Sequence, residues 1–345
     1  MKYSRKKITK AGKKIMTSKS IEERNIALEL INDWRANHLH PLNVMKNGLI
    51  RILTKHRIKP ILISQRLKRL TSIEYKLDLN ESMGLGGMQD IGGYRAVVKD
   101  TKDLFKLKGI LERNTTNHKL NKTVDYVDRP KKSGYRSIHF IYTYNSKLDK
   151  YKNLLLELQI RTKLQHNWAT AVETAGILTK TSLKSSQGPD EWLDFFKIVS
   201  SLFAIKEELP VLEEHNERSM ENLMVECFNL TNELKVIDIL KALRISARQI
   251  EIEKFNGDYY LININIKEKF VNIQTFKKRD YGIASEEYLK LEKDIKENEN
   301  AVVLVSASSI KSLKKAYPSY FLDTSEFISA LERINENCKR LKLVK

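Results

Sequence analysis

Cysteine is nearly absent from this sequence: Cys227 and Cys338 are the two in 345 residues. We expect both to be buried thiols in a reducing cytoplasm. No CxxC, HExxH or other metal-ligand spacing occurs, so a structural metal site is not expected. No apolar run approaches the ~20 residues that a membrane helix needs. The sequence therefore predicts a cytoplasmic protein with no membrane partner.

Glycine and proline are also scarce, at 13 and 6 residues, while hydrophobic residues make up 41% of the chain. This balance is typical of a folded globular protein and excludes a disordered one. A chain of this length has room for two or three domains.

Acidic residues are missing from the first part of the chain, where none precedes Glu22. The whole sequence carries a formal charge of +19, which indicates either a polyanionic partner or a lysine-rich surface. The basic segment 1–19 is either a site for phosphate backbones or a solvated tail. No apolar stretch follows it, so it is not expected to be a signal peptide. Its candidate nucleic-acid-binding residues are Lys6, Lys7, Lys13 and Lys14.

The pattern of apolar residues predicts an α+β fold. Over residues 20–185, helical segments alternate with β-rich ones such as "YRSIHFIYTYN" and "NLLLELQIRT", which indicates a mixed sheet flanked by helices. Residues 190–252 are helical almost throughout and form a predicted connector. Residues 253–345 are expected to form a small α+β domain that begins with a β-hairpin.

The segment "ELQIRT" places three polar side chains on one face of a strand. Residues two apart in a strand point the same way, so Glu157, Gln159 and Arg161 share a face, while Leu158 and Ile160 point into the core. Edge strands often carry such a polar face, but the preceding run "NLLL" favours a central strand. Polar groups there need partners, such as a ligand.

The segment "RPKKSGYRSIHF" surrounds Tyr135 with Lys131, Lys132 and Arg136, and Gly134 permits a tight backbone before the ring. Such a tyrosine can stack on a nucleobase while the cations bind phosphate. The alternative is a basic hairpin with a core tyrosine.

A second strand, "MQDIGGYRAVV", begins with Asp90 and two glycines, which let a ligand or another backbone come close. Asp90 and Glu157 together would make a two-carboxylate magnesium site of the kind used in phosphoryl transfer. Upstream, Arg66 and Lys68 follow the apolar "PILIS" and lie at a strand's end, where α/β folds place ligands. A solvated surface is the alternative for this charge run.

Taken in order, these segments resemble the synthetase domain of the RelA/SpoT family. The shared patterns are R-x-K-x7-K, D-x4-R, G-Y-R-S-x-H and E-x-Q-x-R-T, and the resemblance covers about residues 20–185. It implies that Arg66 and Arg95 flank the adenine of ATP and that Lys68 and Lys76 bind its phosphates.

The same resemblance implies roles on the acceptor side. Asp90 would hold Mg²⁺ with Glu157, which would also draw the proton from the attacking hydroxyl, and Tyr135 would stack on the acceptor base. The residues implied to shape the acceptor pocket are His139, Gln159, Arg161 and His166.

Two departures from the family matter. No His-Asp dipeptide occurs and little chain precedes the synthetase motifs, so a synthetase without the hydrolase domain is expected. His166 stands where small alarmone synthetases tend to have Asn or Asp, which puts a guanine nucleotide acceptor in doubt.

The segments "YSRKKITKAGKKI", "WRANHLHPLN" and "AYPSYFLDT" resemble the toxic small alarmone synthetases, and within them the fused toxin–antitoxin group called CapRel. That resemblance implies a tRNA-modifying pyrophosphotransferase that uses ATP and Mg²⁺ and acts on the 3′ CCA end. It also implies that residues 253–345 form a pseudo-zinc-finger-like antitoxin domain, which senses a phage capsid or other phage protein.

Tyr317 and Tyr320 resemble the group's element that covers the ATP site, although two core tyrosines would give the same pattern. Two other functions stay open: an alarmone synthetase that uses GDP or GTP as acceptor, and a degenerate synthetase that only binds. The intact Asp90, Tyr135 and Glu157 argue against the second.

Overall fold

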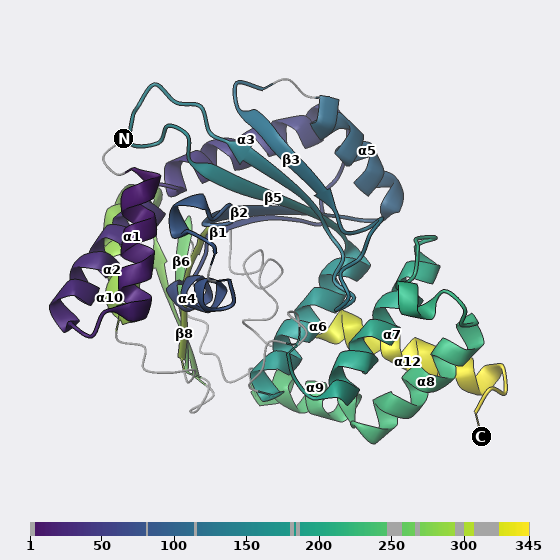
Figure 1. Ribbon diagram of the computed structural model, residues 1–345. Coiled ribbons are helices and arrows are strands. Elements are labelled where there is room, and N and C mark those ends of the chain that lie inside the picture. The colour runs from purple at the N-terminus through teal and green to yellow at the C-terminus, as the bar shows by residue number, and fades with distance from the viewer. Residues whose placement is uncertain are drawn as a thin grey trace.

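The computed structural model describes residues 4–344 except 81, 114–115, 180–182, 184–186, 247–256, 266–269, 294–299 and 307–323. The described residues form one mixed sheet with helices on both sides and a separate group of helices at one end (Figure 1). The predicted α+β class is confirmed. No helix in this part of the chain combines the length and apolar character that a membrane crossing requires.

Three helices open the chain: α1 (Arg5–Thr17), α2 (Ile21–Ala36) and α3 (Leu39–Lys55). Ser4 and Ser20 cap the first two, because each side-chain hydroxyl accepts a hydrogen bond from a backbone N–H three residues on. The basic segment is therefore largely an amphipathic helix rather than a tail. Its apolar stripe, formed by Ile8, Ala11 and Ile15, is buried.

The first part of the sheet consists of five strands in the spatial order β3-β4-β5-β2-β1. The pair β2 and β5 is parallel, and the neighbouring pairs β3–β4, β4–β5 and β1–β2 are antiparallel. Helices α3 and α5 lie over one face of these strands in Figure 1. The bounds are β1 (Leu62–Leu67), α4 (Leu70–Asp78), η1 (Leu85–Gly87), β2 (Gly92–Val98), α5 (Thr101–Arg113), β3 (Lys119–Asp125), β4 (Ile138–Thr143) and β5 (Leu155–Thr162).

The two glycines of the second strand serve different faces of the sheet. A Cβ on Gly92 would come within 2.7 Å of a Leu156 methyl group and 3.1 Å of His38, so close packing under α3 requires glycine there. On the opposite face, a Cβ on Gly93 would meet only the Arg66 carbonyl, at 4.0 Å. The second glycine therefore leaves open space on the face away from α3.

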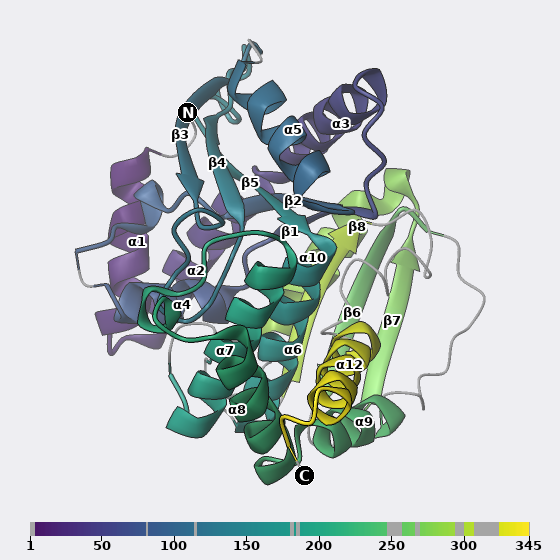
Figure 2. The ribbon, with the colours of Figure 1, turned by 90° about the vertical axis from the view of Figure 1, so that its right-hand side faces the viewer.

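The sheet continues beyond β1 with strands from the C-terminal part of the chain. Its full order is β3-β4-β5-β2-β1-β8-β6-β7, and β8 joins β1 through the pair Arg66 and Val305. Helix α10 packs on β6 and β8 through Ala284 and Tyr288, and Figure 2 shows the three added strands side by side. The bounds are β6 (Tyr259–Asn265), β7 (Phe270–Phe276), η5 (Lys278–Asp280), α10 (Tyr281–Lys293) and β8 (Asn300–Ser306).

The remaining helices gather around a second apolar cluster. Phe327 of the last helix lies against Phe196 and Phe203, with ring centroids 6.0 Å apart in both pairs. Both Cys227 and Cys338 are free and buried in this cluster, as predicted. The bounds are α6 (Lys163–Thr179), α7 (Asp190–Lys206), η3 (Glu213–His215), α8 (Met220–Glu233), α9 (Val236–Ser246) and α12 (Ser325–Arg340).

The predicted unit of residues 253–345 thus contributes to two places in the fold. Strands β6–β8 and α10 extend the sheet, whereas α12 packs with α6, α8 and α9, the helices of the predicted connector and its neighbour. Pairing between residues so distant in sequence has no local signal. The domain boundaries themselves stay a prediction.

Candidate active site

One pocket lies on the face of the sheet that Gly93 leaves open. It collects side chains from β1, β2, β5 and the turn before β2, and it brings together six of the predicted site residues. The lining residues are Ser64, Gln65, Arg66, Lys68, Asp90, Gly93, Tyr94, Arg95, Glu157 and Gln159. Strand register explains the grouping, because Gly93 lies opposite Arg66 on one side and Glu157 on the other.

The predicted polar face of β5 is present. Gln159 Nε2 donates to Glu157 Oε2 at 2.6 Å, and Arg161 Nη2 donates to Gln159 Oε1 at 3.0 Å. The strand lies between β4 and β2, so it is central as expected. Leu158 and Ile160 point away into the core.

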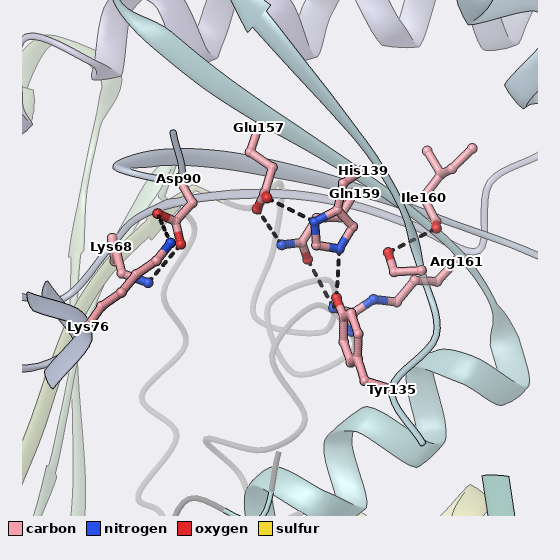
Figure 3. A network of polar contacts seen from close by, with 10 residues as sticks. Lys68, Lys76, Asp90, Tyr135, His139, Glu157, Gln159, Ile160 and Arg161 are labelled. Carbon is pink, nitrogen blue, oxygen red and sulfur yellow. Dashed lines mark hydrogen bonds and ion pairs between the residues drawn. The ribbon is translucent and has the colours of Figure 1, made fainter. Parts of the chain in front are cut away.

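Behind Glu157 a chain of hydrogen bonds continues into the protein (Figure 3). His139 Nδ1 lies 2.9 Å from Glu157 Oε1, and His139 Nε2 lies 2.9 Å from the Tyr135 hydroxyl. The same hydroxyl accepts a hydrogen bond from Arg161 Nη2 at 2.6 Å. Each polar group in this network therefore fixes the next one, and the Glu157 carboxylate is held at both oxygens.

The electrostatics of the network keep Glu157 ionised. Burial raises the pKa of Glu157, but the hydrogen bond and charge of His139 lower it more, so the net shift is downward. Burial lowers the pKa of His139, while Tyr135 and Glu157 outweigh that effect and raise it overall. The pair therefore favours a carboxylate beside a histidine that is readily protonated.

At the other side of the pocket, Asp90 holds two lysines. Its carboxylate oxygens lie 2.8 Å from Lys68 Nζ and 3.1 Å from Lys76 Nζ. Burial opposes ionisation of Asp90, yet the two ammonium groups lower its pKa to about 2. The two lysines of the R-x-K-x7-K pattern thus meet at the aspartate, with Lys76 reaching in from α4.

Two arginines, Arg66 and Arg95, line the pocket, and Arg161 lies close to Arg95. Burial, followed by the nearby charge of Arg161, lowers the pKa of Arg95 to about 10, and Arg66 acts in the same direction. The guanidinium stays charged at neutral pH. Its Nε is buried and has no hydrogen-bond partner among the described residues. A buried donor of this kind is suited to an anionic or polar ligand.

Two of the predicted acceptor residues are less open than their assigned roles suggest. The ring of Tyr135 is 3% exposed, with Arg161 Cζ 5.0 Å and Lys131 Nζ 5.4 Å from its centroid. A base could stack on it only if these cations moved. His166, on α6, is 7% exposed and does not line the pocket. These burials follow from tertiary packing that no local pattern shows.

The loop before Tyr135 is fixed by α7. Gly134 has φ of +86°, and a Cβ there would lie 2.9 Å from the Ser200 side chain. Ser200 Oγ donates to the Gly134 carbonyl at 2.6 Å and accepts from Arg136 Nε at 3.2 Å. Sequence reasoning did not identify Ser200, because nothing near it in the chain resembles a site motif.

The fit of a magnesium ion depends on the two carboxylates. Asp90 and Glu157 line the same pocket and supply the oxygen ligands that Mg²⁺ prefers. Both oxygens of Asp90 are occupied by lysine ammonium groups, so an ion can bind there only when these lysines turn toward another anion. Within the described residues, no group of three or more His, Cys, Asp or Glu side chains could hold a metal.

Tyr317 and Tyr320 lie outside the described residues. The lysines proposed to bind nucleic acid, Lys6, Lys7, Lys13 and Lys14, are exposed on α1.

Comparison with known proteins places the pocket in a region that resembles known synthetases. Residues 65–182 match the family described as "Region found in RelA / SpoT proteins". The chain is 34% identical over 119 residues to the probable GTP diphosphokinase RSH3 of Arabidopsis thaliana, which is 33% of this chain and 15% of that protein. It is also 34% identical over 84 residues to the GTP pyrophosphokinase YjbM of Bacillus subtilis, 24% of this chain and 39% of that one. The chain thus spans less than half the length of these relatives.

Among solved structures, small alarmone synthetase 2 from Bacillus subtilis aligns with 52% of this chain and 95% of its own, at 21% identity and a TM-score of 0.45. A GTP pyrophosphokinase family protein from Streptococcus pneumoniae aligns with 60% and 98%, at 22% identity and a TM-score of 0.43. The family match over residues 65–182 includes every residue that lines the pocket apart from Ser64.

Proposed function

We propose that this chain transfers a pyrophosphate group from ATP to an acceptor hydroxyl. The observation that carries the proposal is the pocket itself, in which Arg66, Lys68 and Arg95 face Asp90 and Glu157. Cations are needed where negative charge develops on the transferred group, and a carboxylate is needed to take the proton of the attacking hydroxyl. AMP is the leaving product.

Glu157 is proposed as the base. Its lowered pKa means that it is ionised at neutral pH and can accept a proton, while His139 and Gln159 fix its orientation. When Glu157 takes the hydroxyl proton, a neutral His139 can accept that proton in turn, because the raised pKa of His139 favours its protonated form. The proton thus stays within a hydrogen-bonded pair that is shielded from solvent.

The proposed cofactor is Mg²⁺, held by Asp90 and Glu157. When bound, the ion would neutralise phosphate charge in the pocket. Lys68 and Lys76 pair with Asp90 in this structure, and we propose that they turn to the ATP phosphates when nucleotide enters. Arg66 and Arg95 would then flank the adenine.

The proposed acceptor is the 3′ CCA end of tRNA. Support comes from α1, which presents basic residues on its exposed face and packs against α2, η1 and α4. Since α4 also carries Lys76, which reaches Asp90 at the pocket, the lysines of α1 lie on an element that packs directly against a side of the site. The alternative acceptor is GDP or GTP, which the names of the matched relatives support directly.

Labelled products decide between these acceptors. ATP labelled on the γ-phosphate is incubated with the protein and either deacylated tRNA or GDP and GTP. Label on tRNA at a far higher rate supports the tRNA proposal, and comparable or faster labelling of the guanine nucleotides supports the alternative. If no AMP forms from an activated protein with any acceptor, the chain is a binding protein and the transfer proposal is wrong.

We further propose that the C-terminal part of the chain silences the enzyme and that a phage protein, such as the major capsid protein, activates it. This proposal rests on the resemblance of Tyr317 and Tyr320 to the element that covers the ATP site in the fused toxin–antitoxin group. A tyrosine ring suits the space between Arg66 and Arg95, since guanidinium groups attract aromatic faces. A phage protein that binds better when the block is displaced would shift the population to the active state.

A further inference from the structure

Arg35, on α2, lies between the pocket and the C-terminal strands. Its side chain is 0% exposed. Nε and Nη2 donate to the carbonyl of Lys68 at 3.0 and 2.8 Å, and Nη1 donates to Asn32 Oδ1 at 2.9 Å. Nη2 also donates to the hydroxyl of Tyr288, whose ring centroid lies 5.4 Å from Arg35 Cζ. One guanidinium thus joins the end of β1 to α10.

The peptide that Arg35 holds is the one that carries Lys68 into the pocket. The Lys68 backbone N–H donates to the carbonyl of Ile91 at 2.9 Å, and its Nζ pairs with Asp90 at 2.8 Å. The main chain at Lys68 is therefore gripped on its carbonyl side by Arg35 and on its amide side by the residue next to Asp90. A fork of two charge-assisted hydrogen bonds to one carbonyl restricts both distance and angle.

A second chain of hydrogen bonds connects the pocket to the C-terminal strands, at a residue three positions before Lys68. Gln65, which lines the pocket, donates from Nε2 to Asn43 Oδ1 at 2.7 Å. Asn43 Nδ2 in turn donates to the hydroxyl of Tyr259, on β6, at 2.9 Å. Between these two contacts, Arg66 pairs directly with Val305 of β8. Three pocket residues of one segment are thus braced from the C-terminal strands and α10.

We propose that Tyr288 is a positioning residue that acts through Arg35 on Lys68. In this view the C-terminal layer, defined as β6–β8 and α10, is a permanent support for the phosphate-binding end of the pocket. Without the Tyr288 hydroxyl, Arg35 keeps its charge but loses one of the acceptors that hold its fork in place. The proposal rests on the function above only in assigning phosphate binding to Lys68.

The parent protein is the full chain with Tyr317→Ala and Tyr320→Ala, which removes the proposed block of the ATP site. In this parent Tyr288→Phe is the test, and Tyr260→Phe is the matched control. Tyr260 is a buried tyrosine of the same layer, and its hydroxyl accepts from the Gly257 amide at 3.4 Å, just before β6. Two readouts are compared: binding of α,β-methylene-ATP by titration calorimetry, and hydrogen exchange of the backbone amides from Leu67 to Arg69. Thermal unfolding measures the general loss of stability in each variant.

Tyr288→Phe should weaken binding of the ATP analogue roughly three- to tenfold, the range common for indirect coupling, and should speed exchange at the Lys68 amide. Tyr260→Phe, at a similar loss of thermal stability, should change neither. Arg35→Lys removes the fork, so Tyr288→Phe should add little to its effect on binding. This lack of additivity is expected only if the hydroxyl acts through Arg35.

The proposal is overturned if the two tyrosine variants bind the analogue equally well and exchange equally fast at Lys68. It is also overturned if the effects of Tyr288→Phe and Arg35→Lys simply add. If the parent chain without the proposed block does not bind the analogue, the proposed transfer function fails, and the exchange measurement alone still decides whether Tyr288 positions Lys68.

Discussion

Glu157 is the residue on which most of the site's geometry converges. Its two oxygens are held by His139 and Gln159, and across the sheet it faces Gly93, which leaves room for a substrate. The local alternation of β5 predicted which side chains share its face. The hydrogen bond from His139 needed β4 to be placed beside β5, which no local pattern reveals.

Glu157→Gln should abolish transfer while leaving the fold intact. The amide keeps the shape of the side chain but removes the base and one negative charge, and loss of a general base alone lowers rates by ~10²–10⁴. AMP release from labelled ATP measures the effect, and thermal unfolding checks the fold. Gln159→Glu is not a suitable control, since it would add charge to the pocket. An active Glu157→Gln protein would contradict the assignment.

His38 leads to a prediction about how the free energy of unfolding depends on pH. It is buried at the start of α3, where its Nδ1 contacts the Trp34 carbonyl at 2.8 Å, and burial lowers its pKa from 6.5 to about 4. Below pH 6.5 the imidazole of His38 binds a proton in the unfolded chain but stays neutral in the folded chain until the pH approaches 4. The unfolding free energy should therefore fall as pH drops to 4, with a contribution of up to about 3 kcal/mol from this residue.

Urea unfolding at several pH values tests this, with His38→Gln as the comparison. Glutamine can still donate to the Trp34 carbonyl but does not titrate, so the variant should lose stability less steeply between pH 6.5 and 4. Its stability at neutral pH can differ from that of the wild type, so the slope is the quantity to compare. Equal slopes would show that His38 does not titrate as described.

Among the elements, α1 and β3 show best what sequence patterns could and could not predict. Lysines crowd residues 1–19, and the sparse apolar positions Ile8, Ala11 and Ile15 become a buried stripe only because α2, α4 and η1 pack there. Strand β3 reads "KLNKTVD" and is exposed or half-buried at every position, so it lacks an apolar signal. This segment is a strand because it pairs with β4, a neighbour that the local sequence does not reveal. The strongly apolar segment "NLLLELQIRT" was predicted as a strand, and β5 begins two residues after the start of that segment.

Helix α1 carries the prediction about nucleic acid. Changing Lys6, Lys7, Lys13 and Lys14 to Glu should weaken tRNA binding and flatten its salt dependence, because fewer counterions are released from the phosphates. All four side chains are exposed, although Lys14 pairs with Glu23 at 3.3 Å. Filter binding of tRNA over a range of salt concentrations measures both quantities.

The matched control makes the same change in net charge at four lysines outside α1. Lys55, Lys59, Lys99 and Lys102 are also exposed and lie around the end of α3 and the start of α5. Their conversion to Glu should affect tRNA binding much less. Equal losses of tRNA binding from both sets would mean that only net charge matters. If the changes on α1 leave tRNA binding as it was, α1 is merely a solvated surface.

At the scale of the molecule, the C-terminal residues have two opposed roles in what we propose: support of the pocket and control of it. Point changes and truncation should therefore differ. Tyr317→Ala combined with Tyr320→Ala should make the full chain toxic and active without phage. If this variant stays harmless while phage infection still triggers Glu157-dependent activity, these tyrosines are not the block.

A chain that stops at residue 255 should instead be poorly folded and should release little AMP. Truncation there removes β8 from β1, Tyr288 from Arg35 and Phe327 from the helical cluster. Loss of a buried aromatic side chain alone costs about 3–5 kcal/mol, a large part of the stability of a typical domain. A truncated protein that melts cooperatively and transfers pyrophosphate at full rate would show that the C-terminal layer is dispensable.

The position of β8 also governs when the protein can assemble during synthesis. Strand β1 is made early and its partner β8 is made near the far end of the chain, so at ordinary elongation rates the interval is on the order of tens of seconds. Throughout that interval the edge of β1 is open on the ribosome-bound chain, where it can pair with other strands or be shielded by a chaperone. We expect the pocket to become rigid only after β8 has left the ribosome, so that an incomplete chain would not carry out the proposed transfer to the tRNAs around it.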